Sequence, residues 1–317
     1  MNLENDFDYT QLTLDDDYEG RVTACFISAK ANVGSRAAVL YLHGFVDYFF
    51  QAHLAEQFLH NNIDFYALDL RKYGRALLDG QHPNYCRDVS EYFEEIDLAV
   101  SRLEQGAATS IYLLGHSTGG LIANLYLLDG AYRQKIKGLI LNSPFFKFNL
   151  PVHLRLILPL LSRVLGAAFP YSNTPGVLPP VYPQSLHKDY YGEWDFNLEW
   201  KPIAGFPAYF CWLSAISKAH KKIRKGKDIE VPVLVIHSAK SSLPEEYGTY
   251  ATNTDIVLNV EDIKSIGTAL GPNTTLMEVN GAMHDIFLSA PVVRKRAFAQ
   301  MFAWIASLEL NNRETSA

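Results

Sequence analysis

A serine stands between two glycines at the end of an apolar run, in the sequence YLLGHSTGGL at residues 112–121. Gly115, Ser117 and Gly119 have the spacing G-x-S-x-G. Between a buried strand and a helix, a turn of this kind lifts the serine oxygen clear of a sheet. The first amides of the following helix then point toward the serine, where they can bind a developing oxyanion. The pattern predicts that Ser117 is a nucleophile; the alternative is a glycine-rich turn that only joins two elements.

A serine nucleophile needs a general base and an acid that orients the base. In a strand–turn–helix setting, the acid and then the histidine follow the serine along the chain. His284 lies in a short loop after the run TTLMEVNG at 274–281, so we predict that it is the base. His237, which ends another apolar run, is a weaker competitor. Of the remaining histidines, five lie in polar, surface-like contexts: His53, His60, His82, His187 and His220.

The acid is expected in the loop after the run VPVLVIHS at 231–238. Asp255 precedes the apolar stretch IVLNV, which could anchor its backbone and shield its carboxylate. Asp262 has the place of a residue in the first turn of a helix. We predict Asp255 as the acid, with Asp262 as the runner-up. The same loop holds three further carboxylates: Glu245, Glu246 and Glu261.

An oxyanion hole takes two backbone amides, and the amide of Thr118, directly after the serine, is one candidate. The run YLHGFVDYF at 41–49 follows an early apolar run and carries a glycine at position 44. Gly44 would let the loop bend so that the amide of Phe45 faces the serine. We predict that Phe45 and Thr118 form the oxyanion hole; the alternative for Gly44 is a simple strand-ending glycine.

A mostly parallel sheet must position these residues. Near-continuous apolar runs are typical of strands buried on both faces, and stretches with helical spacing alternate with them. This alternation predicts an α/β fold of βαβ units with helices on both faces of the sheet. The first thirty residues predict an antiparallel hairpin that leads into it. The predicted strands lie at 36–44, 64–70, 110–117, 137–144, 231–238 and, more weakly, 274–281; the predicted helices lie at 52–61, 89–104, 118–128 and 291–308.

Residues 145–230 break this alternation with a long, proline-rich and aromatic stretch. We expect a helical cap (lid) insertion here, with a helix that returns to the core formed by residues 1–144 and 231–317. Its inner face would line an apolar pocket. The alternatives are a helical hairpin packed on the core and a membrane span, which the stretch's His153, Arg155, Pro159 and Arg163 interrupt.

Composition sets broad limits. The chain has 317 residues, 48% of them hydrophobic and 20% charged, which is typical of a soluble globular protein. A formal charge of −6 argues against a nucleic-acid partner. Three cysteines without metal-binding spacing and an acidic, polar N-terminus without a signal-peptide pattern favour a cytoplasmic location. The basic run at 217–228 is read as a solvated helix face, with transient contact to an anionic membrane surface as the alternative. No sequence feature fixes an oligomeric state.

Together these motifs resemble those of the α/β-hydrolase superfamily, and within it the lysophospholipase and monoacylglycerol-lipase-like branch, often described as serine-aminopeptidase-like. LHGFVDYF resembles its oxyanion loop, GHSTGG its serine turn, and the segments around Asp255 and His284 its acid and base segments. LDLRKYGRA at 68–76 is similar to its D-x-R-G-x-G-x-S element, with departures at Lys72 and Ala76. Ala239 replaces an aspartate that often follows HS in one subgroup, which favours Asp255 as the acid.

The resemblance covers nearly the whole chain and implies an α/β-hydrolase fold with a serine hydrolase activity. From the apolar, aromatic cap we expect a mono-acyl lipid or another hydrophobic ester as substrate, cleaved through an acyl-enzyme, with no metal and no organic cofactor. A first alternative is a peptidase or amidase on the same triad, with a substrate amine held by Glu193, Asp195 or Glu199. A second alternative is a hydrolase-fold protein that binds its ligand without catalysis.

Overall fold

One eight-stranded sheet runs through the protein, in the order β1-β2-β4-β3-β5-β6-β9-β10. The computed structural model describes residues 1–317 apart from 32–34, 107, 175–179, 226–228, 244–245 and 315–317. The strands of the sheet are β1 Asp8–Thr13, β2 Thr23–Ala29, β3 Ala37–Leu42, β4 Asp64–Asp69, β5 Ser110–His116, β6 Ile136–Asn142, β9 Val233–Ser238 and β10 Thr274–Val279.

The sheet is parallel except at one edge. Strand β1 pairs antiparallel with β2, and β2 pairs antiparallel with β4, whereas the other neighbours are parallel. The predicted hairpin and all six predicted strands are confirmed. Strand β10, the weakest in the sequence pattern, forms the other edge and is the most exposed of the parallel strands. The serine strand β5 lies inside the sheet, between β3 and β6.

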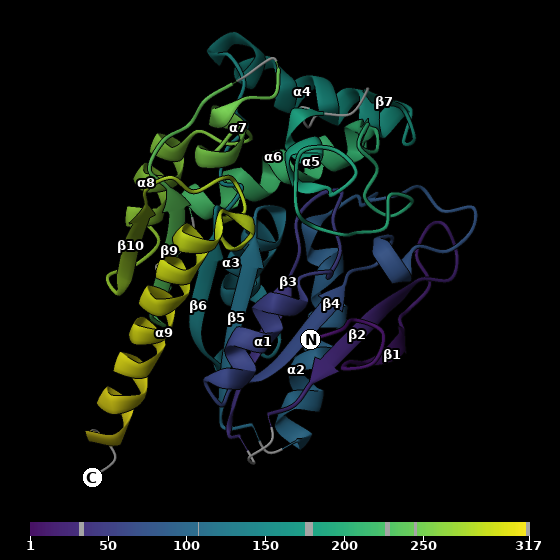
Figure 1. The fold of residues 1–317 in the computed structure, drawn as a ribbon. Helices are drawn as coiled ribbons and strands as arrows, with labels where there is room; N and C mark the ends of the chain where they lie inside the picture. The colour runs from purple at the N-terminus through teal and green to yellow at the C-terminus, as the bar shows by residue number, and fades with distance from the viewer. Residues whose placement is uncertain (32–34, 107, 175–179, 226–228, 244–245, 315–317) are drawn as a thin grey trace.

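Helices cover both faces of the sheet, as Figure 1 shows. The helices are α1 Ala52–His60, α2 Phe93–Gln105, α3 Thr118–Asp129, α4 Val152–Ala168, α5 Val181–Leu186, α6 Phe210–Lys225, α7 Thr249–Asn253, α8 Val260–Thr268 and α9 Pro291–Glu314. Short 3-10 turns lie at Gly74–Ala76, Val89–Tyr92, Arg133–Lys135 and Ile286–Leu288. Each of the four helices predicted from the sequence is present, three of them within a few residues of the expected bounds, while α9 continues past its expected end at residue 308.

Strand β3 shows why its residues are apolar without a break. Leu40 and Leu42 point to the face that α2 and α3 cover, whereas Tyr41 points to the face of α1 and α9. Side chains alternate between the faces of a strand, so a strand covered on both sides buries every residue. The two apolar layers thus hold β3 and β5 in place within the sheet. The carboxyl ends of these two strands carry the predicted oxyanion loop and the serine.

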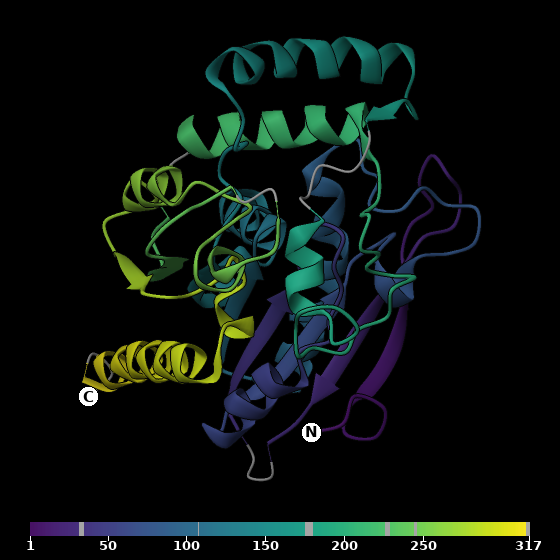
Figure 2. The ribbon, with the colours of Figure 1, turned by 45° about the horizontal axis from the view of Figure 1, so that its top comes forward.

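Residues between β6 and β9 build a layer over one end of the sheet. Helices α4 and α6 pack side by side there, as Figure 2 shows, and α6 also contacts α3. A small antiparallel ladder joins β7 Asn173–Thr174 to β8 Ala208–Tyr209. The division of the chain into a core and a cap insertion at 145–230 stays a prediction.

Helix α4 contains Pro159 and has an exposed apolar surface. Within the described residues, we find no helix long and apolar enough to cross a membrane.

Candidate active site

Ser117 occupies a sharp turn between β5 and α3. Its backbone lies at φ 51° and ψ −114°, in a region that side-chain-bearing residues rarely adopt. Its amide donates to the carbonyl of Asn142 on the neighbouring strand (3.0 Å), which holds the turn in place. A Cβ on Gly119 would stand 2.3 Å from the carbonyl oxygen of Leu42. Glycine is therefore required at position 119 for the turn to pack this close to β3.

His284 and Asp255 meet in the interior. The Nδ1 atom of His284 lies 2.9 Å from Oδ2 of Asp255, and both side chains are buried. The other carboxylate oxygen, Oδ1, accepts hydrogen bonds from the amides of Val257 (2.9 Å) and Leu258 (2.7 Å). With Nδ1–H donating to the carboxylate, Nε2 of His284 is the acceptor that a serine hydroxyl would need.

The runner-up acid, Asp262, lies elsewhere. It stands in the first turn of α8 and pairs with Lys147 (2.5 Å) and Arg155 (3.6 Å). Glu261 pairs with Lys264 at the surface, Glu246 is exposed, and position 245 lies outside the described residues. The structure thus brings Asp255, and not Asp262, to the predicted base. The apolar stretch after Asp255 is what does so, since Ile256 and Leu258 are buried in the core.

Ser117 and His284 line one cavity of about 260 Å³ together with Phe45 and Thr118. Most of its wall is apolar, and part of that wall comes from the layer that contains α4 and α6. The apolar and aromatic lining residues are Phe145, Phe148, Leu150, Leu158, Trp212, Leu213, Val257 and Leu258. Asp47, His116, Asn149, Tyr182 and Lys201 add polar groups. The arrangement offers a mainly apolar cavity with the predicted nucleophile and base at its wall.

The loop after β3 runs directly beside the serine. A Cβ on Gly44 would lie 3.3 Å from the Cβ of Ser117, so this loop approaches as closely as glycine permits. The ring of Phe45 packs on Trp212 of α6, with centroids 4.2 Å apart. The backbone of residues 44–45 therefore lies beside Ser117, where an oxyanion donor is expected. The side chain of Phe45 lies under α6.

The contacts that hold this loop were not predicted from the sequence. Asp69, at the end of β4, accepts a hydrogen bond from the amide of Phe49 (2.8 Å) and pairs with Arg75 (2.7 Å). Arg75 in turn donates to the carbonyl of Phe49 (3.1 Å). Both residues belong to LDLRKYGRA, which the sequence identified only as a motif. An acid at the end of a buried strand, with an arginine six residues on, was the available signal.

Two buried histidines support the same region. His43 bonds through Nδ1 to the carbonyl of Gly44 (2.8 Å), and its Nε2 accepts from the amide of Leu70 (3.1 Å). These partners assign the proton to Nδ1, and burial lowers the pKa of the His43 ring. His116 packs near His284, with ring centroids 4.9 Å apart, and burial likewise lowers its pKa.

The expectation of a surface setting is wrong for His187 and His220, which are both buried. His187 bonds to the carbonyl of Phe196 (3.1 Å), and His220 bonds to that of Phe145 (2.8 Å). Their polar sequence neighbours point outward, while the rings satisfy their N–H groups on backbone oxygens inside. His237 is buried and bonds to the carbonyl of Ser238 (2.8 Å). None of the three lines the cavity as described.

A buried ion pair stands at the polar side of the cavity. Lys201 Nζ lies 2.7 Å from Oδ1 of Asp47, and both side chains are almost fully buried. Burial alone would favour the protonated acid, but the ammonium of Lys201 holds the pKa of Asp47 below its usual range. As to metals, no three ligating side chains come together in a suitable group anywhere in the described part of the chain.

Comparison with known proteins gives consistent matches. Residues 34–291 match the family described as "Serine aminopeptidase, S33". A Schizosaccharomyces pombe protein named "Putative monoglyceride lipase" is 30% identical over 139 residues, which cover 40% of this chain and only 35% of that protein's length. A Haemophilus influenzae protein named "Probable lysophospholipase L2" is 27% identical over 266 residues, covering 76% of this chain and 74% of that protein.

Solved structures share the fold. A soluble variant of monoglyceride lipase from Saccharomyces cerevisiae, in complex with a substrate analogue, gives a TM-score of 0.68 at 18% identity and covers 94% of this chain and 97% of that one. A carboxyl esterase from Bacillus coagulans gives 0.67 at 15% identity, over 95% and 98% of the two chains. The expected α/β-hydrolase fold is confirmed.

Proposed function

The chain belongs to the serine aminopeptidase S33 family of α/β-hydrolases, and we propose that it is a serine esterase of hydrophobic esters. Ser117 is the nucleophile, His284 the general base and Asp255 the acid that orients the base. The observation that carries the proposal is the buried hydrogen bond between His284 and Asp255 beside the cavity that His284 shares with Ser117. Serine suits acyl transfer, whereas other branches of the fold place an aspartate at this turn.

The reaction follows from this geometry. The hydroxyl of Ser117 attacks the ester carbonyl while Nε2 of His284 takes its proton, and Asp255 stabilises the imidazolium that forms. The amides of Phe45 and Thr118 bind the oxyanion; losing one such donor typically costs ~3 kcal/mol of barrier stabilisation. His284 returns the proton to the departing alcohol. Water, activated by the same imidazole, then hydrolyses the acyl-enzyme and frees the carboxylic acid.

A mono-acyl lipid is the substrate that the site supports best. The cavity wall is mainly apolar and aromatic, which favours an acyl chain over a polar acid. Monoglyceride and lysophospholipid are also the substrates that the names of the two matched relatives indicate for those proteins.

An aminopeptidase is less well supported because Glu193 pairs with Arg294 and Asp195 with Lys188. Glu199 is not among the residues described around the cavity either.

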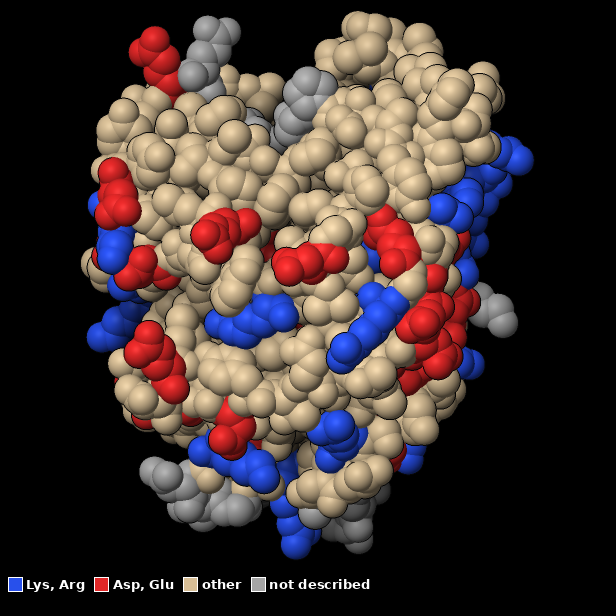
Figure 3. Space-filling model, turned by 90° about the vertical axis from the view of Figure 1, so that its right-hand side faces the viewer, with Lys and Arg blue, Asp and Glu red and all other residues tan. Residues whose placement is uncertain are grey.

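We also propose transient contact between α4 and a membrane surface. Seven large apolar side chains on this helix are exposed: Val152, Leu154, Leu156, Ile157, Leu160, Leu161 and Val164. The uppermost part of the molecule, where α4 lies in Figure 1, carries almost no charge on the face in Figure 3. A groove beside α4 is lined by Arg163, Lys218 and Lys221, which would suit anionic headgroups. Leu158, on the same helix, lines the cavity.

Hydrolysis of an ester panel tests the proposed function. The panel contains p-nitrophenyl esters from acetate to palmitate, a monoacylglycerol, a lysophospholipid and an aminoacyl amide. We expect turnover of the longer acyl esters and of at least one mono-acyl lipid, and no turnover by Ser117→Ala. Preference for a small polar acid would overturn the lipid assignment alone. A folded protein that hydrolyses no ester would overturn the esterase, and turnover of the amide alone would favour the peptidase.

A further inference from the structure

Three residues with left-handed backbone meet at the predicted oxyanion loop. Val46, Lys72 and Asn84 have φ values of 50°, 63° and 59°, and all three are buried. The amide of Val46 donates to the side-chain Oδ1 of Asn84 (3.2 Å), and the amide of Asn84 donates to the carbonyl of Lys72 (2.9 Å). A β-branched valine in this region costs about 1–3 kcal/mol, so its surroundings must hold it there.

Val46 directly follows Phe45, whose amide is the proposed oxyanion donor. The conformation of Val46 therefore decides in which direction the chain leaves Phe45. On the other side of this residue, the carbonyl of Val46 lies 3.5 Å from the ammonium of Lys201. The amide of Val46 faces Asn84 instead, so that the two polar groups of this residue have partners from different elements. Of these two contacts, the hydrogen bond that the amide of Val46 donates to Oδ1 of Asn84 is the shorter.

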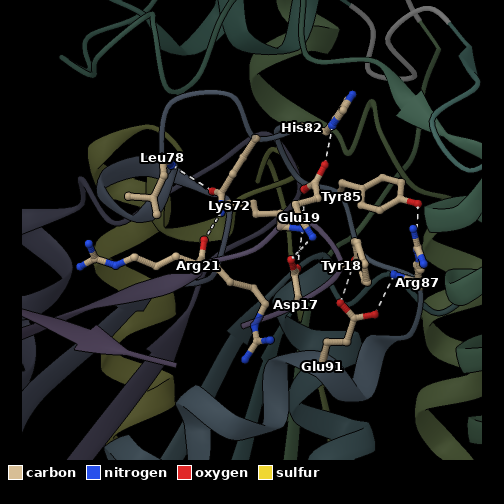
Figure 4. Close-up of polar contacts among 12 residues, drawn as sticks. Asp17, Tyr18, Glu19, Arg21, Lys72, Leu78, His82, Tyr85, Arg87 and Glu91 are labelled. Atoms are coloured by element: carbon tan, nitrogen blue, oxygen red, sulfur yellow. Dashed lines mark hydrogen bonds and ion pairs between the residues drawn. The ribbon is translucent and has the colours of Figure 1, made fainter. Parts of the chain in front are cut away.

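Lys72, whose carbonyl accepts the hydrogen bond from the amide of Asn84, is itself held by two carboxylates. Its ammonium lies 2.6 Å from Asp17 and 2.6 Å from Glu19, and 4.5 Å from the ring centre of Tyr18. Figure 4 shows these side chains closing around it from the loop between β1 and β2. The motif that this element resembles has a glycine at position 72, which adopts a left-handed backbone without strain. Here a lysine takes that conformation and is fixed by the buried ion pairs.

We propose that Asn84 is a positioning residue of the oxyanion hole. Its side-chain carbonyl holds Val46 in the left-handed conformation and thereby keeps the amide of Phe45 directed at the reacting carbonyl. The inference rests on the proposed function, since it presumes that this amide binds an oxyanion. Asn84 is not among the described lining residues of the cavity, so the proposed role is exercised through the loop.

Two substitutions separate the hydrogen bond from the backbone. Asn84→Gly keeps the left-handed conformation and removes the acceptor, whereas Asn84→Asp keeps the conformation and the acceptor oxygen and loses only the weak donation from Nδ2 to the carbonyl of Lys72 (3.4 Å). We expect Asn84→Gly to lower kcat about tenfold, a fraction of the effect of losing a donor outright, with KM changed less than twofold. Asn84→Asp should stay within about threefold of the wild type. Asn62→Gly is the matched control, because Asn62 is also left-handed (φ 55°) but exposed and remote in the loop after α1.

A trifluoromethyl ketone with a matching acyl chain gives a second readout, because its serine adduct carries an oxyanion. Its Ki should rise with Asn84→Gly in proportion to the loss of kcat/KM, which a merely structural role would not produce. A folded Asn84→Gly with wild-type kcat and Ki overturns the proposal, and so does an equal loss in Asn84→Asp. If Asn84→Gly does not fold, Asn84→Ser, whose hydroxyl is too short to reach Val46, replaces it. A wild type inactive on every ester would instead refute the proposed function.

Discussion

At the scale of single residues, the two oxygens of Asp255 are divided between two tasks. One faces Nδ1 of His284, and the other accepts the amides of Val257 and Leu258. Two backbone donors and an imidazole N–H leave the carboxylate well satisfied although it is buried. This fixes the plane of the carboxylate, and with it the orientation of the imidazole.

Asp255→Asn should reduce kcat by about 10³- to 10⁴-fold, because an amide in this position favours the wrong tautomer of His284. Asp262→Asn is the matched control, since Asp262 lies on α8 with Lys147 and Arg155 as its partners. It should leave kcat unchanged. Steady-state kinetics with a p-nitrophenyl ester would check both variants. Equal losses in the two would contradict the assignment of the acid.

That Ser117 and His284 share a cavity and that Asp255 bonds to His284 could be expected from the sequence, because each residue stands beside a local pattern: a glycine pair, a strand end, an apolar stretch. Their catalytic roles stay predictions. The contacts of Asn84 and Lys201 could not be predicted in this way. Asn84 meets Val46 across 38 residues, and Lys201 meets Asp47 across 154, so no local periodicity records either contact. Such long-range polar contacts emerge only once the sheet has brought the loops together.

At the scale of elements, the strands could be predicted one by one, whereas the layer above the sheet was expected only as a helical cap without its individual elements. Strands buried on both faces are marked by unbroken apolar runs, and these gave all six predicted strands. The ladder of β7 and β8 has two residues in each strand, and α5 has six residues. Elements so short lack a readable period, because their conformation depends on tertiary contacts rather than on local propensity.

The exposed apolar face of α4 carries its own prediction. Leu156→Ser should weaken binding to vesicles of anionic phospholipid roughly tenfold, because a side chain that is 76% exposed in water would otherwise be buried in lipid. Hydrolysis of dissolved p-nitrophenyl butyrate should not change. Leu310→Ser on α9, at another highly exposed leucine, is the matched control. Vesicle sedimentation measures the binding, and unchanged binding by Leu156→Ser would contradict the proposed contact.

At the scale of the whole molecule, stability should depend on pH through buried histidines. Burial lowers the pKa of His220 to about 3, while its N–H bonds to the carbonyl of Phe145 and so ties α6 to the chain after β6. In the unfolded chain this ring titrates near its ordinary pKa of about 6.5. Below that pH the unfolded state binds a proton that the folded state does not. The contribution of His220 to the free energy of unfolding is therefore fully present above about pH 6.5 and is lost as the pH falls toward 3.

The free energy of unfolding should fall between pH 7.5 and pH 5. For His220→Gln this fall should be about 2 kcal/mol smaller than for the wild type. Glutamine retains an N–H donor and does not titrate. His60→Gln is the control, since His60 is exposed at the end of α1. Urea unfolding at the two pH values measures the difference. An equal fall in His220→Gln and the wild type would show that this ring does not link pH to stability.

The most direct measurement is covalent labelling of the intact protein by an alkyl fluorophosphonate, mapped by mass spectrometry. We predict one adduct on the oxygen of Ser117, no adduct in Ser117→Ala, and labelling about 100-fold slower or more in His284→Ala, because the serine then has no base. An adduct on a different residue, or wild-type labelling rates without the imidazole, would contradict this prediction.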